Sequence, residues 1–93
     1  MAAKKYKLNQ GFVTQKLKDK IVIFSGERSL LFTLNDTAAF IYNGIKLGWD
    51  EEKIIKSICV KFDVNESRAG KDVNECIKDL IKKNILQESK PNQ

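Results

Sequence analysis

The side chains whose type and spacing are best suited to chemistry lie on one predicted helix near the C-terminus. Four of them recur at i, i+4, i+7 and i+11, which is one continuous helical face: Arg68, Asp72, Glu75 and Asp79. This line is mainly acidic and would favour a basic residue in a bound partner. Alternatively, it is an ordinary solvated face with an internal Arg68–Asp72 ion pair. The sequence also leaves open a second wall on the opposite flank of the helix, formed by Gly70, Asn74 and Lys78.

The remaining reactive groups do not form a recognisable catalytic or metal site. The chain has no histidine, no glycine-rich phosphate loop and no serine or cysteine beside a base. Cys59 and Cys76 occupy apolar helical positions without the spacing of a metal or redox pair, so we expect two reduced thiols that pack as small hydrophobes. We therefore expect no enzymatic activity, no cofactor and no metal.

Three short apolar segments in the N-terminal half predict a β-meander. They lie at residues 12–17, 21–24 and 29–34, with turn-forming residues between them. Alternation in the first segment places Val13 and Leu17 on one face, which we expect to point inward. Consecutive strands joined by short turns pair in order, so the first and third segments should be the edges of the sheet.

Three amphipathic helices are predicted after the meander, at about 36–47, 51–62 and 66–83. Asn35 or Asp36 would cap the first helix, and Asp50 the second. The order predicts an α+β fold, a three-stranded antiparallel meander followed by three helices, in a winged-helix-like arrangement. We expect a basic flexible arm at 1–11, one domain at 12–86 and a disordered tail at 87–93.

The third predicted strand, residues 29–34, lacks the features that normally block pairing at a sheet edge. It has no charge, proline or glycine, so its backbone could accept an added peptide strand. Alternatively, another element or a second copy covers this edge. Leu30 and Phe32 would form the floor of side-chain pockets, and Leu31 and Thr33 would face the other way. Each backbone hydrogen bond contributes only about 0.5–1.5 kcal/mol, so buried apolar anchors must supply most of the affinity.

Charge is distributed unevenly along the chain. The net charge is +5; residues 1–20 carry six lysines and one aspartate, whereas residues 21–93 carry eleven basic and eleven acidic side chains. A DNA-binding domain would gather cations on its docking helix, but residues 66–83 carry five basic and four acidic groups. No apolar run reaches the ~18 residues of a membrane span, and no signal peptide is evident. We expect a cytoplasmic protein that binds neither membrane nor nucleic acid.

Several short motifs follow one another from the end of the predicted meander through the helices. They are Leu34-Asn35-Asp36-Thr37-Ala38-Ala39, Ile41-Tyr42, Gly48, Glu51-Glu52-Lys53-Ile54-Ile55, Lys61-Phe62-Asp63-Val64, Asp72-Val73 and Leu80-Ile81-Lys82-Lys83-Asn84-Ile85-Leu86. With these motifs in this order, the chain resembles the PqqD family of small peptide-binding proteins, also called RiPP recognition elements (RiPPs are ribosomally made, post-translationally modified peptides). The resemblance covers residues 12–86. Tyr42 stands where the family often has tryptophan, and Asn84 where glycine is common, and such departures leave the cognate pathway open.

The resemblance implies a non-catalytic protein that binds the leader segment of a precursor peptide. The leader would add as a strand beside residues 29–34, against the helix at 66–83. The implied second partner is a modifying enzyme such as a radical-SAM protein, a cyclase, a dehydratase or a leader peptidase, and we expect a monomer or weak homodimer. A winged-helix DNA-binding regulator is the alternative. The candidate peptide-binding residues are Ser29, Leu30, Leu31, Phe32, Thr33, Arg68, Asp72, Glu75, Cys76 and Asp79.

Overall fold

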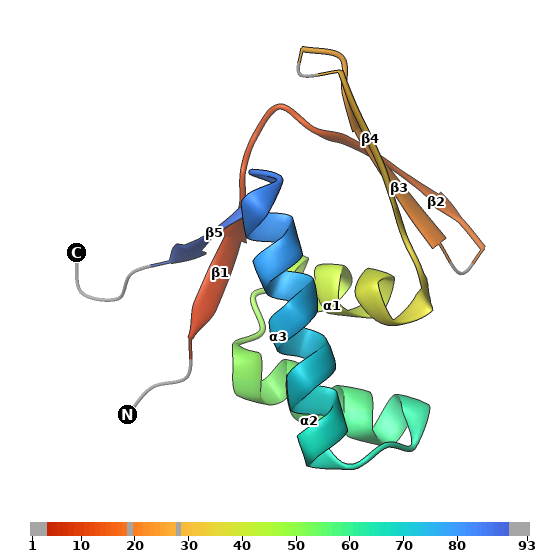
Figure 1. The fold of residues 1–93 in the computed structure, drawn as a ribbon, viewed down its shortest axis with the longest axis vertical. Helices are drawn as coiled ribbons and strands as arrows, with labels where there is room; N and C mark the ends of the chain where they lie inside the picture. Colours follow the sequence, from red (N-terminus) through yellow and green to blue (C-terminus); the bar gives the residue numbers. More distant parts are fainter. Residues whose placement is uncertain (1–3, 19, 28, 90–93) are drawn as a thin grey trace.

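The computed structural model describes residues 4–18, 20–27 and 29–89; its elements between residues 13 and 82 follow the predicted order of three strands and then three helices, and one further strand lies at either end (Figure 1). Within these residues the elements are β1 (Lys5–Leu8), β2 (Val13–Leu17), β3 (Lys20–Ser25), β4 (Leu30–Leu34), α1 (Asp36–Lys46), α2 (Glu51–Phe62), α3 (Glu66–Lys82) and β5 (Leu86–Ser89). Strands β2, β3 and β4 form an antiparallel sheet in that order, which confirms the predicted α+β meander. None of the helices in the described residues is long and apolar enough to cross a bilayer.

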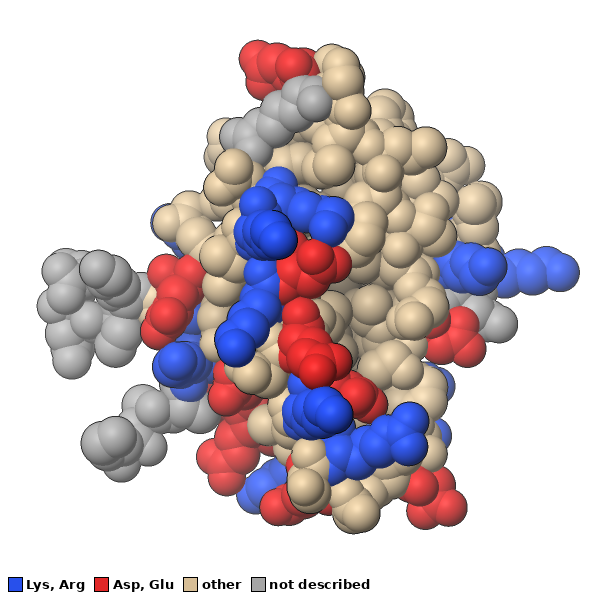
Figure 2. Space-filling view, in the orientation of Figure 1, with Lys and Arg blue, Asp and Glu red and all other residues tan. Residues whose placement is uncertain are grey.

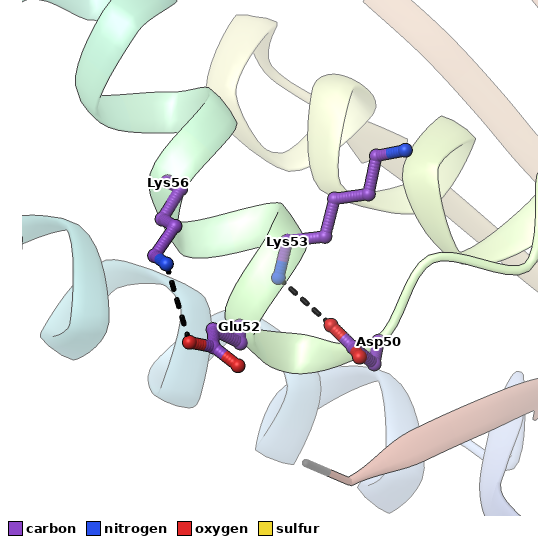
Figure 3. Close-up of polar contacts among 4 residues, drawn as sticks. All are labelled: Asp50, Glu52, Lys53 and Lys56. Atoms are coloured by element: carbon purple, nitrogen blue, oxygen red, sulfur yellow. Dashed lines mark hydrogen bonds and ion pairs between the residues drawn. The ribbon is translucent and has the colours of Figure 1, made fainter. Parts of the chain in front are cut away.

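The helices begin where short polar side chains can cap them. The side chains of Asn35, Asp50 and Asn65 each accept a hydrogen bond from the backbone N–H three residues later, at 2.9, 2.8 and 2.8 Å. At the start of α2 this cap is followed by an ion pair between Lys56 and Glu52, 3.3 Å apart (Figure 3). These local interactions fix where each helix starts and therefore how α1 and α3 stand relative to the sheet.

One face of the three-stranded sheet packs on the helices, and the other is exposed. Ile21, Ile23 and Leu34 are buried on the inner face. On the outer face Val13 lies opposite Phe24, which lies opposite Leu31, and these side chains are 54%, 40% and 73% exposed. The expectation that Val13 and Leu17 point inward is therefore wrong. Pairing with β3 places Val13 and Leu17 on the solvent side of the sheet, and all five residues of β2 are exposed.

The chain ends form a second small sheet, in which β1 pairs antiparallel with β5. In the view of Figure 1 this sheet lies on the other side of α3 from β2–β4. Tyr6 of β1 is buried, and its hydroxyl donates a 2.9 Å hydrogen bond to the Glu51 carboxylate. The sequence predicts a flexible arm at 1–11 and a disordered tail at 87–93, of which residues 1–3 and 90–93 lie outside the described residues. Within the described residues, Lys5–Leu8 and Leu86–Ser89 are paired strands. These segments are polar, but each supplies the other's backbone partners.

The turn between α1 and α2 is closed by close packing. Trp49 lies over Gly44, where an added Cβ would come within 2.8 Å of the indole Cε3. The Trp49 ring also meets Phe40 edge-on, with ring centroids 6.0 Å apart. This contact fixes the start of α2 against α1. Helix α1 also lines the groove described next.

Candidate functional site

A groove of about 420 Å³ separates β4 from α3, with α1 as its floor. The two walls belong to elements far apart in sequence, and α1 brings them together because it follows β4 directly and packs against α3. We call this feature the β4–α3 groove. Its lining residues are Phe32, Thr33, Leu34 and Asn35 from β4 and the α1 cap, Thr37, Ala38 and Ile41 from α1, and Asp72, Glu75, Cys76, Asp79 and Leu80 from α3.

Strand β4 presents an unpaired edge beside this groove. In the described part of the chain β4 pairs with β3 alone, so no described element covers its other edge. Leu30 and Phe32 are half-buried, whereas Leu31 and Thr33 are exposed, which confirms the predicted alternation. The edge therefore combines accessible backbone donors and acceptors with an apolar side chain, Phe32, that reaches into the groove.

The α3 wall of the groove is acidic. Figure 2 shows acidic side chains in a column along α3, beside a largely uncharged surface over the sheet. Asp72, Glu75 and Asp79 all line the groove. Arg68 lies outside it and forms an exposed ion pair with Asp72, 3.7 Å long, which contributes little to stability. The groove thus has an acidic wall next to a floor that includes Ala38 and Ile41.

One lysine, Lys83, contacts a lining residue on each wall of the groove, although it does not line the groove itself. The Lys83 ammonium group donates a 2.8 Å hydrogen bond to Asp79 and lies 4.4 Å from the centre of the Phe32 ring. It therefore connects the α3 wall to the β4 wall. Because Asp72 pairs with Arg68 and Asp79 with Lys83, Glu75 is the groove carboxylate that has no ion pair among the described residues.

Cys76 supplies a partly buried thiol in the same wall. Burial raises the pKa of this thiol to about 12, and the nearby Asp79 carboxylate adds to the shift. At neutral pH the group is a protonated thiol that behaves as an apolar surface. Neither Cys76 nor Cys59 forms a disulfide in the described structure.

The structure brings together most, but not all, of the candidate residues. Ser29, Leu30, Leu31 and Arg68 do not line the groove, and Ser29 lies in the turn before β4 with a φ of 52°. The alternative wall of Gly70, Asn74 and Lys78 does not line it either. The candidates that do line it are Phe32, Thr33, Asp72, Glu75, Cys76 and Asp79.

The candidate set misses the contribution of α1 and of Lys83. Thr37, Ala38 and Ile41 form the floor of the groove, although Ala38 and Ile41 belong to the periodic stripe that predicts this helix. Ala38 is a small residue in that stripe, and its short side chain leaves room for the groove above α1. Nothing in the sequence pattern links Lys83 to Phe32, because that contact depends on the tertiary packing of α3.

A larger surface cavity, about 660 Å³, lies along α2 beside Trp49. Its charged groups already have partners: Asp50 caps α2 and Lys56 pairs with Glu52 (Figure 3). The Lys53 ammonium lies 5.1 Å from the centre of the Trp49 ring. No strand lines this cavity. It therefore offers no backbone template for an extended peptide.

The profile of the family described as Coenzyme PQQ synthesis protein D (PqqD) matches residues 20–86. The chain belongs to the PqqD family. The match covers every element from β3 to α3, including both walls of the groove, and leaves β1 and β2 outside. No curated protein matches the sequence significantly.

Two solved structures share this PqqD fold. One is "TbiB1 in Complex with the TbiA(beta) Leader Peptide", 21% identical, with a TM-score of 0.81 over 87% of this chain and 94% of that chain. The other is "Lasso peptide synthetase B1 complexed with the leader peptide", 18% identical, with a TM-score of 0.82 over 89% of this chain and 98% of that chain. Both therefore match nearly the whole described fold.

Proposed function

We propose that this PqqD-family protein is a non-catalytic recognition element that binds the leader segment of a ribosomally synthesised precursor peptide. The leader pairs as an added strand with β4, against α3. The observation that carries this proposal is the unpaired β4 edge next to an apolar-floored groove. Two proteins of the same fold are described in complex with leader peptides, which supports the same role here.

The chemistry of the groove defines the leader that fits it. Backbone pairing with β4 supplies register, at about 0.5–1.5 kcal/mol per hydrogen bond. Alternate side chains of an added strand point to the same face, so one set would enter the groove. We expect an apolar side chain to contact Phe32, Ile41 and the Cys76 thiol, and a lysine or arginine to approach Asp72 and Glu75.

The second partner is the enzyme that modifies the peptide. Of the two structures of this fold, one is described as a lasso peptide synthetase component, which supports an enzyme of RiPP biosynthesis as the partner. A cyclase, leader peptidase, dehydratase or radical-SAM protein would fill this role, with the recognition element as a monomer or weak homodimer. Neither the family nor the two similar structures support the DNA-binding alternative.

A peptide-display selection tests the proposal with random sequences in place of a native leader. Twelve-residue peptides are selected on the wild-type protein and then tested on two variants. Ala38→Phe places a ring in the groove floor, while Leu47→Phe adds a ring at an exposed position at the end of α1, where Leu47 is 70% exposed.

We expect the selected peptides to share an apolar residue and a nearby basic residue. Their binding should fall by about tenfold or more in Ala38→Phe, because the variant fills the space of one apolar anchor, and stay unchanged in Leu47→Phe. Peptides that bind both variants as well as the wild type would contradict groove binding. Circular dichroism melting of Ala38→Phe separates a blocked groove from a lost fold.

A further inference from the structure

Another cavity of about 420 Å³ lies on the side of α1 opposite the β4–α3 groove. The β4–α3 groove uses Thr37, Ala38 and Ile41 of this helix, and this cavity uses Ala39, Phe40 and Asn43. A single helix therefore separates the two spaces. This cavity is lined by four lysines, three from the β2–β3 hairpin and one from α2: Lys16, Lys18, Lys20 and Lys61. We call it the lysine cavity.

The lysine cavity carries an excess of positive charge. Asp36 is the sole carboxylate among the described residues that line it, and it sits in the first turn of α1, where the helix dipole stabilises a negative charge. No ion pair of the described residues involves any of the four lysines. Asp19, within the same hairpin, lies outside the described residues. Figure 2 shows basic side chains projecting at this end of the sheet.

The floor of the lysine cavity is aromatic. The rings of Phe40 and Phe62 meet edge-on, 5.8 Å apart and at 88°. The Lys61 ammonium lies 5.8 Å from each ring centroid, so the two rings hold this cation at the cavity. The combination suits a chain segment that offers both carboxylates and an apolar side chain, rather than a small inorganic anion.

We propose that the lysine cavity docks an acidic segment of the modifying enzyme. The identification of that partner rests on the proposed function, whereas the acidic chemistry rests on the charge of the cavity. The two spaces flanking α1 have opposite charge, with Asp72, Glu75 and Asp79 on one side and the lysines on the other. A basic leader and an acidic enzyme segment would therefore occupy separate sites at the same time.

Charge distribution argues against nucleic acid as the occupant. A duplex presents phosphates along its whole length and needs cations spread over a matching surface. Three of the cavity lysines lie in residues 1–20, whereas residues 21–93 are neutral, with eleven basic and eleven acidic side chains, and the neighbouring α3 wall is acidic. Four lysines around one hollow fit a short acidic segment better.

The test uses nuclear magnetic resonance titration of the whole chain with a defined probe, the capped peptide Glu-Glu-Phe-Glu-Glu-Leu. Lys16→Gln/Lys18→Gln/Lys20→Gln removes three charges from the cavity. Lys46→Gln/Lys78→Gln/Lys82→Gln is the control, because it removes the same charge from exposed positions that do not line the cavity.

We expect the acidic probe to shift the amide signals of Asn43, Lys61 and Phe62, and to bind about tenfold more weakly to the hairpin variant but unchanged to the control. Equal weakening in both variants, or shifts spread over all lysines, would overturn the site. Two further titrations also test the site. It would be overturned if inorganic phosphate gave the same shifts at equal concentration, or if a twelve-base-pair duplex bound more tightly through these lysines.

The Ala38→Phe variant separates this inference from the proposed function. Ala38 lines the β4–α3 groove and not the lysine cavity. Acidic-probe binding should therefore persist in Ala38→Phe. Loss of acidic-probe binding together with groove-peptide binding would show that the two sites are not independent and would overturn the inference.

Discussion

The ammonium group of Lys83 lies 4.4 Å from the centre of the Phe32 ring, and the same group is 2.8 Å from the Asp79 carboxylate. Phe32 belongs to β4, and Asp79 belongs to α3, so one side chain connects the two walls of the groove. The contact with Lys83 also neutralises the charge of Asp79. A basic leader residue would therefore compete with Lys83 for Asp79.

Replacing Lys83 with glutamine tests this competition. Lys83→Gln leaves Asp79 unpaired and makes the groove more acidic, so peptides with a basic residue should bind several-fold more tightly and with a steeper dependence on salt. The fold should lose less than about 1 kcal/mol, because the pair is partly exposed. Fluorescence anisotropy with a selected peptide measures the affinity. Weaker binding to Lys83→Gln would mean that Lys83 contacts the peptide directly.

The raised pKa of Cys76 has a measurable consequence for its reactivity. Only the thiolate reacts with iodoacetamide, and a pKa of about 12 keeps the thiolate scarce at neutral pH. In a Cys59→Ser background, the alkylation rate should rise about tenfold per pH unit from pH 7 to 10 without a plateau. A bound groove peptide should slow it further. A plateau near pH 9 would show that Cys76 is not buried as described.

Two helical glycines provide a matched pair for the packing at the α1–α2 turn. Gly44→Ala should destabilise the protein by about 1–3 kcal/mol, because its Cβ would lie 2.8 Å from Trp49 and 3.3 Å from Ile54. Gly70→Ala meets only Ile55 at 4.0 Å and should stabilise α3 by about 0.5–1 kcal/mol. Denaturant unfolding measures both. Equal gains from the two substitutions would contradict the close packing of Trp49 on Gly44.

The buried Tyr6 makes the stability of the N-terminal strand depend on pH. Burial, and then the hydrogen bond to Glu51, raise the pKa of Tyr6 above its usual 10.0. The folded state thus keeps a proton that the unfolded state loses above pH 10, and the stabilisation is present below pH 10 and declines above it. The free energy of unfolding of the wild type should exceed that of Tyr6→Phe by about 1 kcal/mol at pH 7, and this difference should shrink above pH 10.

Thermal melts of the two proteins between pH 7 and 11 follow that difference. Burial also raises the pKa of Tyr42, but Tyr42 is present in both proteins, so its effect cancels in the comparison.

A chain lacking residues 1–8 should melt at a lower temperature than wild type. An unchanged melting temperature would restore the expectation of a flexible arm.

The helices are predictable from sequence because their determinants are local. Asn35, Asp50 and Asn65 each cap a helix within three residues, and the apolar stripes repeat at helical spacing. Asn84, where the family commonly has glycine, adopts a φ of 63°, which asparagine tolerates better than most residues. Such positions carry their structural reason in the residue itself.

The features that sequence reasoning misses depend on distant partners. The pairing of β1 with β5 joins residues near the two chain ends, and each of these four-residue strands has at most two apolar side chains. The outward face of Val13 depends on its register with Phe24. Likewise, the groove walls are predictable as separate patterns on β4 and α3, but the floor from Ala38 and Ile41 depends on how the elements pack.

Residue-resolved amide exchange of Leu30–Leu34 tests strand addition most directly. N–H groups of consecutive strand residues point to opposite sides, so in the protein alone we expect slow exchange where they bond β3 and fast exchange on the other edge. A selected groove peptide should slow that fast set. Uniformly slow exchange before the peptide is added, or a fast set that the peptide leaves unchanged, would contradict peptide pairing with β4.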